Sequence, residues 1–189
     1  EAGRVYYTLK VKEIGVTLNV CCEVTDNVLQ LSVTGIEEDG DVKVKTFAFP
    51  DHHLVSVAAS TPEACLSIAN NVSSDIFYPL KDKAIDHTHQ YGSILLLNSD
   101  KLVATLESNS IYNTRQFLYQ SVQTAGSVVT GIWGNEWIYR GHAGEVVELP
   151  YIKVILSDDC NRDNKVDWQD GAMALQKVYP VPFGVDRVQ

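Results

Sequence analysis

The sequence lacks any run of eighteen apolar residues, so it predicts no membrane-spanning helix. Basic residues are scarce and scattered, with 15 Lys and Arg against 24 Asp and Glu and a net charge of −9. We therefore expect neither nucleic acid nor an anionic membrane as a partner. Methionine is limited to Met173, and the chain begins at Glu1 without an initiator Met or a signal segment. We expect it to be a piece of a larger protein.

Cysteine is also sparse, and none of the four cysteines lies in a CxxC or Cys/His pattern with the spacing of a zinc site. Cys21 and Cys22 are adjacent in a segment that is predicted to be a strand, so their side chains point to opposite faces and cannot pair with each other without distortion. We interpret them as small apolar residues of the interior. The sequence leaves the redox state of Cys21, Cys22, Cys65 and Cys160 open.

Motifs for catalysis are missing too. There is no Gly-x-Ser-x-Gly nucleophile turn. Sugar anomerisation would need an acid and a base, usually two histidines and a carboxylate. His87 and His89, beside Asp86, are candidates, but their place in a polar stretch is more typical of solvated loop histidines. We therefore predict no catalytic residues in this chain.

Strand patterns dominate what is present. Apolar residues alternate from Val5 to Val11 and from Val16 to Val24, which is typical of half-buried strands. Further strand candidates are 29–33, 42–49, 54–59, 94–97, 102–106, 128–132, 137–140 and 146–156. So many strands predict an antiparallel sandwich of two sheets, a mainly β fold. We expect residues 70–90 to form an irregular surface excursion, and 61–71 to be a short helix or another strand.

Residues 159–170 form the most informative motif, because oxygen-bearing side chains occupy positions 1, 3, 5, 9 and 12 of a twelve-residue loop. Ca²⁺ takes six to eight oxygen ligands, and loops of the EF-hand type supply them at these positions and from the carbonyl at position 7. The ligands expected here are Asp159, Asn161, Asp163, the Lys165 carbonyl, Asp167 and Asp170.

Two departures from the usual loop affect its chemistry. Asn164 replaces the Gly of position 6, although Asn tolerates the left-handed conformation better than most residues. Asp170 replaces the Glu of position 12 and is one methylene shorter. The alternative interpretation is an acidic surface turn in which Asp caps a helix. Helical spacing of apolar residues follows from Trp168 to Tyr179, and Pro180 ends it.

The segment Asp159-Cys-Asn-Arg-Asp-Asn-Lys-Val-Asp-Trp-Gln-Asp-Gly-Ala172 resembles a junction in the endo-α-N-acetylgalactosaminidases of glycoside hydrolase family 101. The resemblance implies a galactose mutarotase-like β-sandwich, a dockerin-like calcium loop and then a catalytic (β/α)8 barrel. It also implies a secreted bacterial enzyme that releases Gal-β1,3-GalNAc from Ser or Thr of mucin-type glycoproteins. The two carboxylates of a retaining glycosidase would belong to the barrel, which this chain does not include.

Aromatic residues of the second half suggest a possible sugar contact. Trp133 and Trp137 flank a predicted hairpin turn that could expose both rings, and exposed aromatics serve as platforms for sugars. The competing interpretation is packing in the core, where most large aromatics lie.

The sequence therefore predicts a non-catalytic β-sandwich at residues 1–157, followed by a calcium loop, a helix and a linker at residues 158–189. Its expected role is to scaffold the catalytic barrel of a secreted glycosidase. Alternatives are a carbohydrate-binding module, an active mutarotase or a dockerin-like module that binds a protein partner. Millimolar extracellular calcium would saturate even a weak loop, so we expect a location outside the cell.

Overall fold

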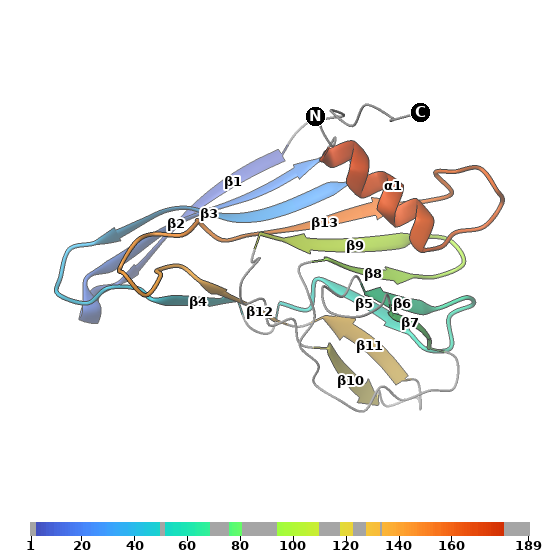
Figure 1. Cartoon of the computed structure of the whole chain (residues 1–189), viewed down its shortest axis with the longest axis horizontal. Helices are drawn as coiled ribbons and strands as arrows, with labels where there is room; N and C mark the ends of the chain where they lie inside the picture. Colours follow the sequence, from blue (N-terminus) through green and yellow to red (C-terminus); the bar gives the residue numbers. More distant parts are fainter. Residues whose placement is uncertain are drawn as a thin grey trace, which may run out of the picture.

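The computed structural model describes residues 3–49, 52–68, 76–80, 94–109, 118–122, 128–132 and 134–179. This part of the chain is mainly β, with a single α-helix near its end (Figure 1). The elements are β1 (Gly3–Val11), a 3₁₀ turn (Lys12–Ile14), β2 (Val16–Thr25), β3 (Val28–Glu38), β4 (Thr46–Phe49), β5 (Val55–Ala58), β6 (Cys65–Ile68), β7 (Ile76–Pro79), β8 (Ile94–Asn98), β9 (Val103–Ser108), β10 (Leu118–Val122), β11 (Val128–Ile132), β12 (Asn135–Ile138), β13 (Tyr151–Ser157) and α1 (Trp168–Val178).

The described strands form one large sheet and two small ones. The large sheet has eight strands in the order β1-β2-β3-β13-β9-β8-β6-β7, and every neighbouring pair is antiparallel. The small sheets are β10-β11-β5 and β12-β4. The predicted antiparallel packing is therefore correct, but the second layer is divided into two pieces instead of forming one sheet.

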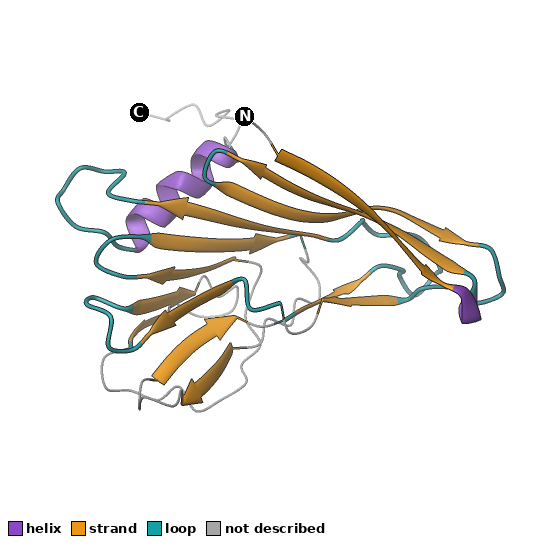
Figure 2. Cartoon of the chain, turned by 180° about the vertical axis from the view of Figure 1, so that it is seen from behind, coloured by secondary structure: helices purple, strands orange, loops and turns teal. Residues whose placement is uncertain are grey.

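The two faces of the large sheet have different neighbours (Figures 1 and 2). Helix α1 lies on one face, over β13, β9 and β8, and we name this the helix face. The small sheets lie on the opposite side, which we name the core face. Strands β8, β9 and β13 are therefore covered on both sides.

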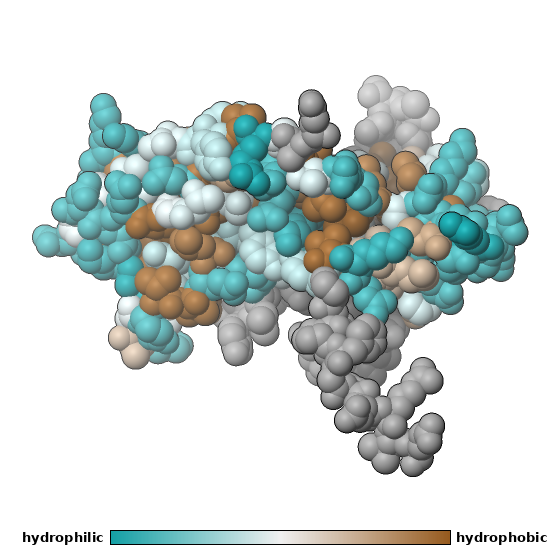
Figure 3. Space-filling model, turned by 90° about the horizontal axis from the view of Figure 1, so that it is seen from above, coloured by the Kyte–Doolittle hydropathy of each residue, from teal (hydrophilic) through white to brown (hydrophobic). Residues whose placement is uncertain are grey.

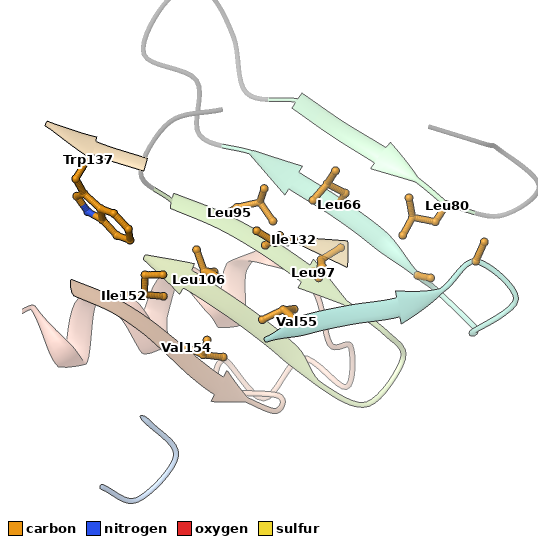
Figure 4. Close-up of a cluster of buried hydrophobic side chains, with 12 residues drawn as sticks. Val55, Leu66, Leu80, Leu95, Leu97, Leu106, Ile132, Trp137, Ile152 and Val154 are labelled. Carbon is orange, nitrogen blue, oxygen red and sulfur yellow. The ribbon is translucent and has the colours of Figure 1, made fainter. Parts of the chain in front are cut away.

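The main hydrophobic core fills the space between the large sheet and the small ones (Figure 4). Leu95 and Leu106 come from the large sheet, whereas Val55 and Ile132 come from β5 and β11. These side chains are buried, and each fully buried aliphatic side chain contributes about 1.5–3 kcal/mol relative to an exposed one. This core sets how the small sheets sit on the large one.

The packing of α1 on the helix face depends on Gly171. A Cβ atom at that position would lie 2.4 Å from Leu96 Cδ2, 2.7 Å from Thr105 Oγ1 and 2.8 Å from Val103 Cγ1. Ala174, one turn later, is also buried. Small residues at these two positions let the helix backbone approach β8 and β9 closely.

The structure of residues 61–80 differs from the predicted surface excursion and shows that the segment 61–71 contains a strand. The segment 61–71, which the sequence left between helix and strand, contains strand β6. The excursion predicted at 70–90 is wrong where it is described, because β7 pairs with β6 at the edge of the large sheet. Leu80 is fully buried in the core, so this segment contributes to packing. Residues 69–75 and 81–93, with His87 and His89, lie outside the described residues.

Other boundaries also differ from those predicted. The candidate at 42–49 is a strand only from Thr46, and the one at 146–156 only from Tyr151. Val44 N–H donates a hydrogen bond of 2.6 Å to Glu38 Oε1 at the end of β3, and Arg140, which forms an isolated bridge with Val146, donates from Nε to the Val44 carbonyl at 3.2 Å. Hydrogen bonds to side chains therefore replace the sheet pairing that alternation alone suggests there.

The register of β2 and β3 contains one irregularity, between Asn19 and Val20. Asn19 pairs with Gly35 and Val20 with Val33, so Thr34 is an extra residue in β3. The Thr34 hydroxyl donates a hydrogen bond of 3.2 Å to the Asn19 carbonyl oxygen. This bulge bends the end of the large sheet formed by β1, β2 and β3, which we name the blade.

The blade contradicts the prediction of half-buried strands. Val5, Tyr7 and Leu9 keep 50, 56 and 52% of their surface exposed, although they share the core face with the buried residues of β13. No residue in the described ranges covers them as the small sheets cover β8 and β9. The alternation of β1 is thus real, but its apolar side remains open.

All four cysteines are free thiols, and Cys21 is buried as expected, whereas Cys22 is only half-buried. In the described ranges, α1 is the single α-helix, and no helix there is both long and apolar enough to cross a membrane.

Candidate calcium loop and the helix it opens

The candidate loop joins β13, which ends at Ser157, to α1, which begins at Trp168 (Figure 1). Its first ligand position, Asp159, holds the loop together from within. One carboxylate oxygen accepts a hydrogen bond of 3.1 Å from the Asp163 backbone N–H, and the other accepts one of 3.0 Å from Asn164 N–H. The side chain at position 1 thus faces the backbone at positions 5 and 6.

The third and fifth positions repeat this arrangement over a shorter span. Asn161 Oδ1 accepts from Asp163 N–H at 3.0 Å, and Asp163 Oδ1 accepts from Lys165 N–H at 2.9 Å. Each is a side-chain turn in which an Asn or Asp binds the backbone two residues on. These turns wind the chain around the side-chain oxygens of positions 1, 3 and 5.

Backbone conformation agrees with the calcium loop pattern at position 6. Asn164 has φ of 68°, in the left-handed region where the usual glycine is most at ease. Arg162 has φ of 64°, so the loop uses this conformation twice. Asn is among the residues that adopt it most readily, whereas Arg has no such preference.

Asp170 links the loop to the helix. It is fully buried, and its Oδ1 accepts hydrogen bonds from Cys160 N–H at 2.8 Å and Asn161 N–H at 3.2 Å. Its Oδ2 accepts from Asp167 N–H at 2.9 Å, while Asp167 Oδ1 accepts from Gln169 N–H at 2.8 Å. The pair Asp167 and Asp170 forms a capping box at the start of α1.

The residues of the loop offer the type of ligand atom that calcium prefers, but one oxygen fewer than the usual loop. All six expected positions offer oxygen, the element that Ca²⁺ prefers. A carboxylate offers about four lone-pair sites, and three of those on Asp170 already bind N–H groups. Asp170 can therefore give one oxygen in this arrangement, not two. Among the described residues, no three His, Cys, Asp or Glu side chains form a ready metal-binding group.

Trp168 is position 10 of the loop and the first residue of α1, and it is less enclosed than a packing anchor would be. The centroid of its ring lies 5.5 Å from the ring centroid of Phe77 on β7, and the two ring planes are tilted by 55°. Trp168 and Phe77 remain 40 and 46% exposed. Two aromatic rings thus form an open pair next to the start of α1.

The structure places Trp137 in the core and not on the surface. It is 4% exposed, and its Nε1 donates a hydrogen bond of 3.1 Å to Asn109 Oδ1. Its ring packs edge-on against Phe47 on β4. No face of this ring is open for a sugar. Trp133, the other expected sugar contact, lies outside the described residues.

Sequence patterns missed a polar cluster at the C-terminal end of α1. The carboxylate of Glu107, on β9, accepts hydrogen bonds from the hydroxyls of Tyr151 at 2.9 Å and Tyr179 at 2.8 Å. Lys153 Nζ donates to the Tyr179 hydroxyl, and lies 4.1 Å from the centroid of its ring. The signal was available, because Tyr151 and Lys153 alternate with buried apolar residues of β13.

Burial governs the acid–base behaviour of this cluster. It raises the pKa of Glu107 above its ordinary value, and the two phenols only partly oppose that effect. Burial also raises the pKa of Tyr151 to about 12 and lowers that of Lys153. The cluster ties the last turn of α1 to β9 and β13.

A second polar pair joins the first residue of β12 to the segment that follows β4. His52 Nδ1 accepts from Leu54 N–H at 3.2 Å, so the ring hydrogen is on Nε2, which donates to Asn135 Oδ1 at 2.9 Å. Burial lowers the pKa of His52, which favours this neutral ring. His52 also stacks on Phe49. The arrangement accounts for His52 as a part of the fold.

The family model described as "Galactose mutarotase-like fold domain" matches residues 1–168, most of the chain. The chain belongs to this family. The matched part of the mutarotase-like domain includes the thirteen strands of the described residues and ends at Trp168, where α1 begins.

A curated relative is much longer than the mutarotase-like domain. It is "Putative endo-alpha-N-acetylgalactosaminidase" of Renibacterium salmoninarum, which is 29% identical over 197 residues. The alignment covers 93% of this chain but only 13% of the relative.

Two solved structures of Geobacillus stearothermophilus resemble the mutarotase-like domain distantly. They are the GH36 α-galactosidases AgaA A355E, in complex with 1-deoxygalactonojirimycin, and AgaB. The TM-scores are 0.40 and 0.41, with 14 and 12% identity. Each match covers 84% of this chain and 24% of the solved chain.

Proposed function

We propose that this mutarotase-like sandwich is a non-catalytic, calcium-binding domain of a longer glycoside hydrolase that acts outside the cell on mucin-type O-glycans. Its role is to hold a catalytic (β/α)8 barrel in a fixed orientation. The family match and the 29% identical relative support the glycoside hydrolase context. The chemistry on the glycan would belong to the barrel, and the sandwich alone should neither cleave nor anomerise sugars.

The buried carboxylate of Asp170 is the observation that carries this proposal. It belongs to the last ligand position of the loop and to the first turn of α1 at once, and it binds backbone N–H groups of both. The same helix is seated on β8 and β9 through Gly171. A metal in the loop would therefore fix the direction in which the chain leaves the sheet.

Calcium in this loop would be held by Asp159, Asn161, Asp163, the Lys165 carbonyl, a water on Asp167 and one oxygen of Asp170. Six ligands are at the lower end of the range for Ca²⁺. We expect a dissociation constant on the order of 10⁻⁵ to 10⁻³ M, as in extracellular modules. Calcium at a hundredfold excess over that constant would stabilise the folded state by about 2.7 kcal/mol.

Terbium luminescence tests the metal site directly, because Trp168 is part of the loop and can sensitise a lanthanide bound there. Signal should appear with Tb³⁺, fall on addition of Ca²⁺, and be lost in Asp163→Ala. The matched control is Asp158→Asn, which removes an exposed carboxylate of the same segment that is not in the ligand set. Equal losses in both variants, or no signal at millimolar metal, would refute the site.

Limited proteolysis tests the role of the metal. With calcium, residues 158–168 should resist cleavage, and with a chelator they should be cut first while the strand-rich body survives. The body has its own core between the sheets, so its folding should not depend on the loop. Cooperative unfolding of the whole chain on chelation would contradict a local joint.

Carbohydrate binding is a second candidate function, favoured by the exposed pair Phe77 and Trp168. Flat aromatic rings offer apolar faces on which sugars can stack. Titration of the domain with mucin-type glycans should give binding that Phe77→Ala abolishes. Trp137→Phe serves as the control, since that ring is buried.

A further inference from the structure

The core face of the blade is apolar across all three strands. On β1 it presents Val5, Tyr7 and Leu9, which pair in register with Cys22, Val20 and Leu18 of β2. On β3 the residues of this face are Leu29, Leu31, Val33 and Ile36. No charged side chain interrupts the stretch between Val5 and Leu9 on this side of β1. Monomeric proteins rarely expose continuous apolar surfaces of this kind unless something binds there.

The opposite face of the same strands is polar. Arg4 pairs with Glu23 at 2.5 Å, and the Thr8 hydroxyl donates to Asn19 Oδ1 at 3.0 Å. Seen from above, from the side of α1, hydrophilic side chains surround separate apolar patches (Figure 3). The blade thus has one surface suited to water and one suited to a protein interior.

Burial on the core face decreases from strand to strand towards the edge. Ile152 and Val154 of β13 are buried, Leu29 and Leu31 of β3 are half-buried, and Val5, Tyr7 and Leu9 of β1 are about half exposed. Two residues of the inner strands, Val33 of β3 and Val16 of β2, are buried as well. The register joins these residues in continuous rows, as Val154 pairs with Leu29 and Leu29 with Val24. The core therefore continues into the blade, and it is the edge strand β1 whose apolar side is left open.

We propose that the core face of the blade is the docking surface for another domain of the same polypeptide. This inference rests on the proposed function, in which the sandwich is one domain of a longer hydrolase. The matched relative supplies such a neighbour, because this chain spans only 13% of its length. A linked domain is present at high local concentration, so a modest apolar surface is enough to hold it.

A second copy of the chain fits the surface less well. Each chain has a net charge of −9, and the repulsion between two such chains would oppose self-association. The free edge strand β1 also carries Arg4 and Lys10, and charged residues on edge strands disfavour pairing between copies. The occupant should therefore present an apolar patch and belong to the same chain.

Tyr6 and Tyr7 provide an internal comparison for the test. They are adjacent residues of one type on opposite faces of β1, with 65 and 56% of their surface exposed. Hydroxyl-radical footprinting read by mass spectrometry should oxidise both at similar rates in the 189-residue chain. In the full-length protein that contains this domain, the rate at Tyr7 should fall at least fivefold while that at Tyr6 stays within twofold.

Two variants of the full-length protein complete the experiment. Tyr7→Ser should lower the melting temperature of the full-length protein by several degrees and make the chain between the two domains more rapidly cleaved by a protease. Tyr6→Ser should change neither quantity. Both variants should leave the 189-residue chain folded, because neither side chain is buried. Unchanged labelling of Tyr7 in the full-length protein would overturn the proposal, as would a stable dimer of the 189-residue chain in which Tyr7 is protected.

The proposed function fails in a different way from this inference. A full-length protein without glycosidase activity, or a loop without calcium, would refute the function while Tyr7 could still be protected. Tyr7 that stays reactive in an active, calcium-binding enzyme would refute only the docking surface.

Discussion

Two parts of one sheet have similar sequence patterns and opposite environments. Strands β8, β9 and β13 lie between α1 and the small sheets, and side chains on both of their faces are buried. The blade belongs to the same sheet and alternates as regularly, yet all nine residues of β1 are exposed. Alternation therefore records which side of a strand is apolar. It does not record whether anything covers that side.

The two parts also treat charge differently. Glu107, Lys153, Gln30 and Glu23 are neighbours in one row across β9, β13, β3 and β2 on the helix face. At the β9 end, burial raises the pKa of Glu107, whereas at the blade the hydrogen bond from Arg4 lowers the pKa of Glu23. The effect of burial is larger for the enclosed Glu107, and the effect of the hydrogen bond is larger for the exposed Glu23.

The largest expected difference comes from shortening a leucine in each part. Leu106→Ala empties a fully buried site and should lower the free energy of unfolding by about 2–5 kcal/mol. Leu9→Ala removes the same atoms from a half-exposed site, so its effect in the 189-residue chain should stay within about 1 kcal/mol. Urea denaturation measures both. Similar losses would mean that the blade is covered in solution.

Gly171→Ala tests the close contact that buries the helix face. The added methyl group would overlap Leu96, Thr105 and Val103, and overpacking of this kind costs about 1–3 kcal/mol. Alanine is the better helix former by about 1 kcal/mol, so a net loss would show that packing outweighs propensity. Met173→Ala, on the exposed side of α1, is the control and should change stability little.

A smaller effect should appear in the pH dependence of the two glutamates. The folded state raises the pKa of Glu107, so its contribution to stability is full below the ordinary carboxyl pKa and is lost as pH rises through the raised value. Glu107→Gln should remove that loss. Glu23 should behave in the opposite way, because its lowered pKa favours folding above the ordinary value and that benefit is lost in acid. Urea denaturation midpoints, measured from pH 3 to 8 in steps of about one pH unit, would show how stability depends on pH for the wild type and for each variant. Parallel profiles for the wild type and Glu107→Gln would contradict the assignment.

The smallest effect is expected at the polar surface of the blade. Arg4→Gln breaks the contact with Glu23, but both side chains are open to solvent and salt screens such pairs. We expect no measurable change in melting temperature at 0.15 M salt, on the order of physiological ionic strength. A clear drop would show that this face is less exposed in solution than in the structure.

Periodicity in the sequence was sufficient to predict most strands and the start and length of α1. Val128–Ile132 and the helix from Trp168 are found as predicted, because local alternation and helical spacing are determined by nearby residues. Strand β10 was missed, and β7 lies in a segment that was predicted to be irregular. Both are short strands at the edge of a sheet, and each pairs with a single neighbouring strand, so little apolar alternation is needed to hold them.

The candidate site was predictable to a similar extent. Spacing alone identified the loop, and the left-handed Asn164 agrees with it. Spacing could not reveal that Asp170 is buried and already binds three N–H groups, since this depends on the contact between helix and sheet. The Glu107 cluster was missed for the same reason, as its members come from β9, β13 and the end of α1.

Thr34 has a consequence for how the sequence of β3 must be interpreted. Side chains of a strand alternate between its two faces, and the extra residue shifts this alternation by one position. Before it, the odd-numbered residues up to Val33 point to the core face, and after it the even-numbered Ile36 does so. If β3 ran as a regular strand through Thr34, residues 35–38 would exchange faces, whereas deleting Thr34 would remove only the extra residue and leave Gly35 opposite Asn19. In such a regular strand Ile36 would point to the polar surface and Glu37 towards the apolar one, so the bulge at Thr34 keeps the far end of the docking surface apolar.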